Sequence, residues 1–440
     1  MSCPKKLRVP LRRASFLLLF VSTIKNAQSV SDGCAVSVTS FGAIGDGVTL
    51  NTASFVAAVN ACSGGGRVVV PAGNESGSIF LTGSLELPFD GLELHVEKGA
   101  TILGSTKERD YPLIPILPSY GSGRDVDSKL RYRPLIFASN VSKLSLTGGG
   151  VVDGQGKPWW LKHFAKELHW SRPRLVECMY CTDLLIEDLT FRDSPFWTLH
   201  PYASDGVIVQ RVTVTAPGWA PNTDGVDPDS CSNVLIKDCV FRAGDDGVAI
   251  KSGLNEAGRA FGKPCENVRI ENVTVEPDFD NGSTNGVSIG SEMSGGIRNV
   301  SVDGLVVQRC AVGVYIKSME GRGGTVEDVT FRNIVADRVM EPIRFAMDYS
   351  YRRRRLDSVL GKIKDEDNGS DEDTTPCFRN LTVENLTATG AALAGTFAGL
   401  ATSEITNIRL QDVSIHGAKE AFVCRNASGT AIRTTPETCF

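Results

Sequence analysis

The stretch from Pro221 to Ser252, PNTDGVDPDSCSNVLIKDCVFRAGDDGVAIKS, decides the fold of this chain. It contains two short segments of the same form, Asp224-Gly225-Val226-Asp227-Pro228 and Asp246-Gly247-Val248-Ala249-Ile250, which are 22 residues apart. Further Gly-Val segments follow at Gly286-Val287 and Gly313-Val314, after intervals of 39 and 27 residues. A segment that recurs in this way indicates one strand position in successive turns of a coil.

The same recurrence brings acidic residues together. If the strands stack, neighbouring layers lie about 4.8 Å apart, and the residues just before each Gly-Val pair lie one above another. Asp224 and Asp246 are then neighbours, with Asp245 beside them. We therefore expect three carboxylates in two adjacent layers.

A second phrase repeats independently, with an apolar residue two positions before an Asp, Asn, Gly or Arg. Its central apolar residues are Ile186, Val209, Ile236, Ile270, Val302, Phe331, Val383 and Leu410, at intervals of 23, 27, 34, 32, 29, 52 and 27 residues. Period-2 strands without helices between them exclude leucine-rich and Rossmann-type repeats, and they predict an all-β parallel β-helix. A β-sandwich is the alternative, but a sandwich does not repeat a phrase at near-constant spacing.

Composition narrows the class of protein. A net charge of −5 and a pI near 5.7 argue against a nucleic-acid partner, which requires a basic surface. Residues 1–29 have the pattern of a signal peptide: a basic start, an apolar run over Ala14–Ile24 and a small-residue cleavage site at Ala27-Gln28-Ser29. No second apolar run is long enough to span a membrane. We expect residues 30–440 to form one secreted domain that is soluble.

Cysteines and sequons agree with secretion. Of twelve cysteines, Cys3 would leave with the signal peptide, so eleven remain and one thiol is expected to be free. Cys34 with Cys62, and Cys424 with Cys439, are the expected terminal disulfides. Cys178 and Cys181 have the spacing of half a zinc site, but no second pair follows, so we expect no metal there. Nine Asn-x-Ser/Thr sequons predict a glycoprotein.

The ends and one interval depart from the repeat. Ala53–Cys62 has helical spacing and is expected to cap the open N-terminal end of the solenoid, and the tail after Gly417 to cap the last coil. The 52-residue interval contains a charged insertion near residues 349–376, with Arg352–Arg355 at its start. We interpret it as a solvated loop; a basic arm that grips a polyanion is the alternative.

From Val38 to Phe345 the chain resembles glycoside hydrolase family 28, the polygalacturonase-like enzymes. The motifs FGAIGDGVTLNT, LTGSLEL, EKGATILGS, VVDGQGKPWW, SPFWTLHP, NTDG, GDDGVAIKSG and SIGSEMSGG stand in family order. The resemblance implies a right-handed, single-stranded parallel β-helix and hydrolysis of pectic galacturonides with inversion at the anomeric carbon. By the same resemblance, Asp245 is the general acid, and Asp224 and Asp246 hold the attacking water. We expect a monomer that needs no cofactor and binds a pectic or other uronic-acid polysaccharide.

Three carboxylates suit this chemistry. An inverting glycosidase places a protonated carboxyl and a carboxylate about 6.5–9.5 Å apart, with a water between them. Gly244 and Gly247 flank Asp245 and Asp246, which favours a turn where both side chains face outward. Three like charges in two layers cannot all ionise easily, so the pKa of one carboxyl should rise, as a general acid requires.

Other residues of the same stretches are candidates for binding substrate. Lys251 and Lys317 fall on the same position of two Gly-Val strands, where their ammonium groups would meet substrate carboxylates. Asn222 belongs to the NTDG motif. Trp197 and His200 lie one coil before Asp224; the tryptophan offers either a face for a sugar ring or core packing.

Two departures from the family pattern affect the substrate. Thr284-Asn285-Gly286 stands where the best-known polygalacturonases have Gly-His-Gly, and Tyr315-Ile316-Lys317 stands in place of Arg-Ile-Lys. Asn285 can still donate a hydrogen bond, and Tyr315 can stack on a sugar. The arginine guanidinium, which would donate two hydrogen bonds to a uronate carboxylate, is lost. These departures leave two substrates open, unsubstituted polygalacturonan and a substituted or rhamnose-containing pectin. Arg322 and Arg344 are candidate substitutes for the lost cation.

Two other functions stay open at this point. Asp227, Asp229 and Asp238 could hold calcium, as in pectic lyases of the same fold. A non-catalytic β-helix that binds cell-wall polymer is also compatible with the two motif losses. Endo or exo action is not predicted.

Overall fold

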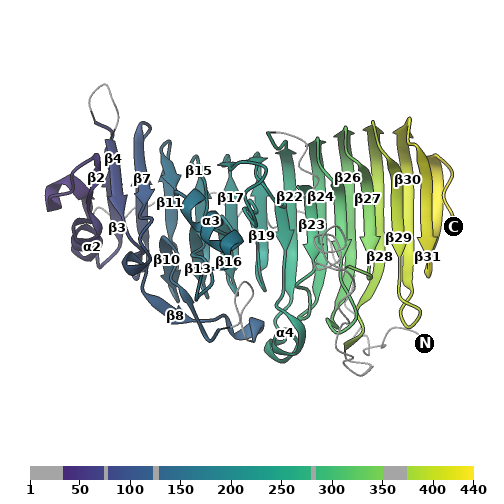
Figure 1. Cartoon of the computed structure of the whole chain (residues 1–440), viewed down its shortest axis with the longest axis horizontal. Coiled ribbons are helices and arrows are strands. Elements are labelled where there is room, and N and C mark those ends of the chain that lie inside the picture. The colour runs from purple at the N-terminus through teal and green to yellow at the C-terminus, as the bar shows by residue number, and fades with distance from the viewer. Residues whose placement is uncertain (1–32, 74–77, 122–127, 279–283, 350–373) are drawn as a thin grey trace.

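The molecule is a long stack of coils. The computed structural model describes residues 33–73, 78–121, 128–278, 284–349 and 374–440. Successive strands advance along one axis from the purple N-terminal end to the yellow C-terminal end (Figure 1). In this part of the chain every pairing between named strands is parallel except that of β8 with β9. The predicted all-β, right-handed parallel β-helix is confirmed.

The strands form parallel stacks that run along the axis of the molecule. The sheet that will carry the site consists of β5 (Leu85–Glu86), β10 (Ile136–Ser139), β13 (Val176–Met179) and β16 (Leu199–Tyr202), continued by β21 (Val248–Ile250), β23 (Asn285–Gly290), β25 (Val312–Lys317), β27 (Glu341–Ala346), β29 (Leu393–Ala398) and β31 (Glu420–Arg425). Isolated bridges from Leu199 to Val226 and from Val226 to Val248 join its two parts.

The remaining strands and the helices complete each coil. The 20-stranded sheet contains β1 (Ala35–Ser37), β2 (Asp46–Leu50), β3 (Gly66–Val70), β4 (Ser78–Thr82), β6 (Leu92–Val96), β7 (Ala100–Gly104), β11 (Ser145–Gly148), β12 (Val151–Asp153), β14 (Thr182–Glu187), β15 (Thr190–Arg192), β17 (Asp205–Gln210), β18 (Thr213–Thr215), β19 (Ser232–Lys237), β20 (Val240–Arg242), β22 (Cys265–Val275), β24 (Ile297–Gln308), β26 (Thr325–Asp337), β28 (Cys377–Thr389), β30 (Ile405–His416) and β32 (Ala427–Thr435). The small hairpin is β8 (Leu113–Pro115) with β9 (Leu130–Tyr132), and the helices are α2 (Thr52–Ala61), α3 (Lys157–Ala165), α4 (Asn255–Phe261), η3 (Val38–Phe41), η4 (Glu108–Asp110) and η5 (Pro118–Tyr120).

The repeated apolar phrase forms a continuous row in the core. Ile186 pairs with Val209, and the same register runs through the other six predicted positions to Leu410. All eight side chains are buried. Burial of each contributes about 1.5–3 kcal/mol, so this row is a main source of the stability of the stack.

The polar residue of the same phrase makes a turn. The residues two positions after the row have positive φ, among them Asp188 at 58°, Asn272 at 53° and Gly304 at 76°. Asn, Asp and Gly enter this left-handed region at the least steric cost, which explains why they recur there. Their side chains also bond along the stack: the Asn385 amide donates to Asn333 Oδ1 at 2.7 Å.

Both ends of the stack are closed covalently. Helix α2 lies at the N-terminal end, as predicted to within one residue, and the disulfide Cys34–Cys62 ties it down (Figure 1). The predicted disulfide Cys424–Cys439 is also present. The tail after Gly417 was predicted to cap the last coil. It instead forms one further coil, because β31 and β32 pair with β29 and β30.

The prediction of a single free thiol is wrong. Six described cysteines are free and buried: Cys178, Cys181, Cys231, Cys239, Cys265 and Cys310. They lie in the main core, where a thiol packs as a small apolar side chain and needs no partner cysteine.

Two predictions fall on residues outside the described part of the chain: the signal peptide at 1–29 and most of the charged insertion near 349–376. Within the described residues, no helix is long and apolar enough to cross a membrane.

Candidate active site

Three corner loops stack at one edge of the site sheet. They follow β15, β18 and β20 and span residues 193–198, 216–225 and 243–247. Their close contact requires glycine: a Cβ on Gly244 would lie 2.1 Å from the Ala220 carbonyl oxygen, and one on Gly225 2.4 Å from the Gly247 oxygen. The glycines of the GDDG motif therefore permit the approach that brings the acidic residues together.

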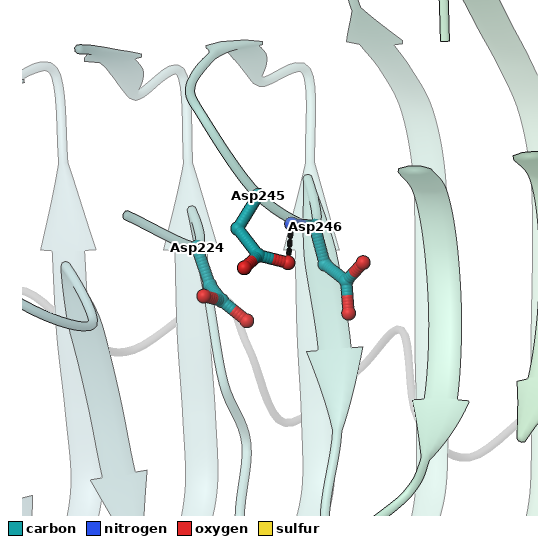
Figure 2. A group of neighbouring side chains, drawn as sticks. All are labelled: Asp224, Asp245 and Asp246. Carbon is teal, nitrogen blue, oxygen red and sulfur yellow. Dashed lines mark hydrogen bonds between the residues drawn. The ribbon is translucent and has the colours of Figure 1, made fainter. Parts of the chain in front are cut away.

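The loops present three carboxylates to one another, as predicted. Figure 2 shows Asp224, Asp245 and Asp246 gathered at adjacent turns, and one oxygen from each lies within 4.8 Å of the others. The backbone N–H of Asp246 donates to Asp245 Oδ1 at 3.0 Å. Asp224 and Asp246 are 3% and 1% exposed, whereas Asp245 is half-buried. Asp245 is the carboxyl that solvent or a ligand reaches most easily.

Asp246 is held at both oxygens. The Asn285 amide donates to Oδ1 at 2.6 Å, and Lys317 Nζ donates to Oδ2 at 2.7 Å. Asn285 therefore orients a carboxylate at the position where the family pattern has histidine. The departure from Gly-His-Gly leaves a hydrogen-bond donor in place.

Asn222 contacts the third carboxyl. Its amide nitrogen lies 3.5 Å from Asp245 Oδ2, and its oxygen accepts a hydrogen bond of 2.8 Å from Arg172. The buried Arg172 also donates to the Pro195 and Pro221 carbonyls, at 3.1 and 2.9 Å. Since the guanidinium fixes the amide oxygen, the amide N–H groups must point toward Asp245.

Lys251 is the second buried cation of the site. Its Nζ lies 3.3 Å from Asp227, 3.4 Å from Glu292 and 3.9 Å from Asp224. Burial alone would lower its pKa, but the charges of Glu292, Asp227 and Asp224 together raise it. Both lysines that we predicted to face substrate are therefore charged and paired with carboxylates of the protein itself.

The carboxyls nearest the centre hold protons more tightly than usual. Burial, followed by repulsion from Asp227, raises the pKa of Asp224 well above its ordinary value. Burial, followed by repulsion from Asp224 and Asp246, does the same to the pKa of Asp245. Burial also raises the pKa of Asp227 to about 7, although Lys251 opposes the change. Repulsion among the crowded carboxyls thus adds to burial in raising the pKa values of Asp224 and Asp245.

Trp197 lies between two cations. The ring centroid is 4.5 Å from Lys251 Nζ and 4.7 Å from the Arg174 guanidinium carbon, and the side chain is buried. Cation–π contacts of this kind stabilise the ammonium group over the ring. Although Trp197 lines the pocket, its contacts fit the support of Lys251 better than an exposed sugar platform.

His200 belongs to a buried network beneath the pocket. Its Nδ1 lies 2.8 Å from Glu177, which also pairs with Arg131 at 2.7 Å, and its Nε2 lies 3.4 Å from Asp229. Asp229 in turn accepts a hydrogen bond of 2.5 Å from the Tyr120 hydroxyl. The network supports β16, the strand that carries His200, and its residues do not line the pocket.

The carboxylates line a partly open pocket of about 300 Å³. Its walls comprise Trp197, Asn222, Asp224, Asp245, Asp246, Lys251, Ser291, Glu292, Lys317 and Tyr349. Tyr315, predicted to contact substrate, is 3% exposed and packs against Tyr349, with ring centroids 6.3 Å apart. Tyr349 is thus the tyrosine that reaches the pocket.

Sequence reasoning missed Ser291, Glu292 and Tyr349. Ser291 and Glu292 directly follow β23, whose register with β21 was predicted. The residues after this strand could therefore have been predicted to lie beside Lys251, which follows β21. Of the two substitute arginines, Arg322 lies 3.4 Å from Ser291 Oγ at the pocket rim, whereas Arg344 pairs with Glu341 at 2.8 Å.

The proposed calcium ligands do not meet. Asp227 pairs with Lys251, Asp229 contacts Tyr120 and His200, and Asp238 lies at a left-handed turn of the other sheet. Calcium takes six to eight oxygen ligands, and these three carboxylates do not converge on one point. The remaining acidic cluster, the three site carboxylates, already has Lys317 at 2.7 Å and Lys251 at 3.9 Å.

Replacement of Asp227 tests the electrostatics of the site. The native state binds its proton up to about pH 7, whereas the unfolded chain releases it near the ordinary aspartate pKa of 3.8. Stability should therefore fall as pH rises from about 4 to 7. Asp227→Asn removes this titration, so we expect a shallower fall, measured by urea unfolding at several pH values.

Asp337→Asn is the control for this experiment. The pKa of Asp337 is lowered by Thr389 and Arg338, so its titration lies below the window, and the slope between pH 4 and 7 should match wild type. Equal slopes in wild type and Asp227→Asn would contradict the raised pKa.

Comparison with known proteins places the chain in a family. Residues 67–435 match the description "Glycosyl hydrolases family 28". A probable polygalacturonase of Vitis vinifera is 35% identical over 417 residues, covering 92% of this chain and 80% of that protein. An endo-polygalacturonase of Pectobacterium carotovorum subsp. carotovorum is 30% identical and covers 70% of this chain and 74% of its own length.

Solved structures of polygalacturonases have a similar fold. An exopolygalacturonase from Thermotoga maritima superimposes with a TM-score of 0.74 at 30% identity, over 91% of this chain and 93% of that one. A polygalacturonase from Erwinia carotovora ssp. carotovora gives a TM-score of 0.69 at 25% identity, over 87% and 94% of the two chains. Together with the carboxylate cluster at the stacked corner loops, these similarities show that the chain belongs to glycosyl hydrolases family 28 and is a glycosidase of the polygalacturonase type.

Proposed function

We propose that this glycosidase hydrolyses α-galacturonosidic bonds in a pectic polysaccharide, with inversion at the anomeric carbon, and that it acts outside the cell. The observation that carries the proposal is the arrangement of three carboxyls within 4.8 Å of one another, of which Asp245 is the most accessible. The signal-peptide pattern of residues 1–29 and the two terminal disulfides support export.

Asp245 is assigned as the general acid. Its raised pKa keeps the carboxyl protonated at a pH where an ordinary aspartate is ionised, and its partial exposure lets it reach a leaving-group oxygen. Asn222 points N–H groups at Oδ2, and the backbone N–H of Asp246 lies at Oδ1. These contacts orient the Asp245 carboxyl group.

Asp224 and Asp246 are assigned as the pair that holds the attacking water. Both are buried below Asp245, and Asp246 has its two oxygens oriented by Asn285 and Lys317. A water bound by two carboxylates is oriented by both and can transfer its proton to either as it attacks.

The three carboxyls have oxygens that lie closer together than the two carboxyl groups of a usual inverting pair. Paired carboxyls are about 6.5–9.5 Å apart in such enzymes, because a water must fit between them. Here one oxygen of each carboxyl lies within 4.8 Å of the others. In our proposal the water is held beside Asp224 and Asp246 rather than between two single carboxyls, so the wider gap is not required.

The charges of the pocket bear on the substrate. Lys251 and Lys317 are paired with protein carboxylates, and the position of the family arginine is taken by the buried Tyr315. Few positive charges in the pocket are therefore left to bind the carboxylate of a uronate at the cleavage position. A polymer with a carboxylate on every sugar would be bound less well than one with fewer carboxylates. We propose a substituted or rhamnose-containing pectin as the preferred substrate.

A calcium-dependent lyase is not favoured. Its metal would have to share the carboxylate cluster with two ammonium groups, at 2.7 and 3.9 Å from Asp246 and Asp224. Two cations in the same place repel a third, whereas a hydrolase uses the same ammonium groups to hold its carboxylates.

Asp245→Asn tests the assignment of the acid. The amide keeps the shape of the side chain but has no acidic proton, so kcat for release of reducing ends from a panel of pectic polymers should fall at least about 100-fold. Binding of polymer, measured by calorimetry, should persist.

Asp303→Asn is the matched control, because Asp303 is a surface carboxyl paired with Arg332 on the other sheet. Its kcat should match that of wild type. Unchanged turnover in Asp245→Asn would contradict the assignment of Asp245 as the general acid. If the wild type binds polymer but releases no reducing ends, the protein is a binding protein and not a hydrolase.

The anomer formed first tests the role of Asp224 and Asp246. Direct attack by water on an α-linkage gives the β-anomer, which proton NMR detects in the first minutes before mutarotation. We expect the β-anomer from wild type. Initial formation of the α-anomer would mean that a carboxylate attacks the sugar directly, and the water-holding role would be lost.

A further inference from the structure

Three exposed apolar side chains lie together outside the pocket. Leu161 and Phe164 on helix α3 and Trp219 in the corner loop 216–225 are 54%, 40% and 43% exposed. We call them the α3 platform. None of the roles assigned so far accounts for their exposure.

The rings of the platform are held rigidly from below. Trp219 meets the buried Trp160 edge to face at 5.3 Å, and Phe164 lies 6.5 Å from Trp219 with the two planes inclined by 38°. Trp160 is anchored by a hydrogen bond of 3.0 Å from its Nε1 to the Ser194 carbonyl, and it packs against Ala216 and Ala220. A ring fixed on one side and open on the other loses little freedom when a ligand covers it.

The platform is continuous with the pocket. Trp219 precedes the pocket residue Asn222 by three residues, and its loop packs on Gly244, next to Asp245. The segment that contains α3 joins β12 to β13, and the loop with Asp224 follows β18, two coils later at the same corner. At about 4.8 Å per layer, the segment leaves the stack roughly 10 Å before Asp224. Trp160 of α3 then reaches the loop of Asp224, where it packs against Ala216 and Ala220. Figure 1 shows α3 in front of the middle coils.

The charge around the platform fits an acidic sugar polymer. Lys157 and Lys166, at the two ends of α3, are exposed. Lys162 on the same helix pairs with Glu108 at 2.5 Å. An aromatic ring stacks on the apolar face of a sugar, and ammonium groups attract its carboxylate, so the helix offers both contacts at one place.

We propose that the α3 platform is a distal subsite for the polysaccharide chain, binding a sugar residue on the N-terminal side of the catalytic pocket. The ligand is a pectic chain in which uronate residues meet the lysines of α3 and a sugar face lies on Trp219. The identity of the ligand rests on the proposed function, whereas the position of the subsite rests on the platform alone. Affinity should therefore increase with chain length until the chain reaches α3.

The test compares ligand lengths in a protein that does not degrade them. In an Asp245→Asn background, calorimetry measures the binding of oligogalacturonides of increasing length and of rhamnose-containing pectin. Adding Trp219→Ala should weaken binding of the long ligands about tenfold, which corresponds to one well-packed aromatic contact, and leave the shortest unchanged. Trp219→Phe should restore most of the affinity.

Two further variants keep the result independent of folding. Phe164→Ser removes the second exposed ring of the platform, and it should also weaken only the long ligands. Val335→Ala changes a residue of β26 that is 52% exposed and remote from α3, and it should have no effect. A loss of stability would weaken ligands of every length equally.

The outcomes separate this inference from the proposed function. If wild type releases no reducing ends but long chains still bind through Trp219, the function fails and the subsite stands. If wild type hydrolyses pectin but Trp219→Ala binds long chains as well as its parent, the subsite is wrong. It is equally wrong if no pectic ligand binds, or if the variant changes only self-association in sedimentation, which would make the platform a protein interface.

Discussion

Two buried ammonium groups make the carboxylate cluster possible. Lys251 and Lys317 lie among Asp224, Asp227, Asp246 and Glu292, with nitrogen–oxygen distances between 2.7 and 3.9 Å. Removing carboxylates from water is strongly unfavourable unless opposite charges and hydrogen bonds compensate. Because the carboxylates outnumber the lysines, part of the charge is relieved by protonation instead, which is the state that a general acid requires. Charge pairing and acid catalysis are thus two results of one arrangement.

The coil geometry places these groups with little freedom. Parallel pairing keeps Val226, Val248, Val287 and Val314 in one column, so the residues before each valine arrive at the same corner. Gly225 and Gly244 let the corner loops touch. The left-handed turns after the core row return every coil to the same path. A substitution in any of these positions would displace a carboxylate without touching it.

The path of the backbone could be predicted from the sequence, but the contacts of the individual side chains could not. Period-2 strands and recurring turn residues determine which residues share a column, and so the meeting of Asp224, Asp245 and Asp246 could be predicted. The commitment of both lysines to protein carboxylates could not, because a long side chain at a known position can turn either to solvent or to a neighbour. Tyr315 was misplaced for the same reason, since strand register does not reveal that Tyr349 covers it. The six free cysteines show that composition alone does not give disulfide pairing in a chain with a large core.

The central claim is that a protonated Asp245 acts beside the Asp246 carboxylate that Lys317 holds, and the pH dependence of kcat/KM on a pectic substrate tests it most directly. Burial and repulsion raise the pKa of Asp245, so activity should be lost as pH rises through that raised value. At lower pH a proton on Asp224 removes its ability to accept a proton from the water, so activity should be lost there too. The account predicts a bell-shaped profile whose alkaline limb lies above the ordinary pKa of aspartate. A rate that keeps rising beyond neutral pH would show that no protonated carboxyl takes part, and would contradict it.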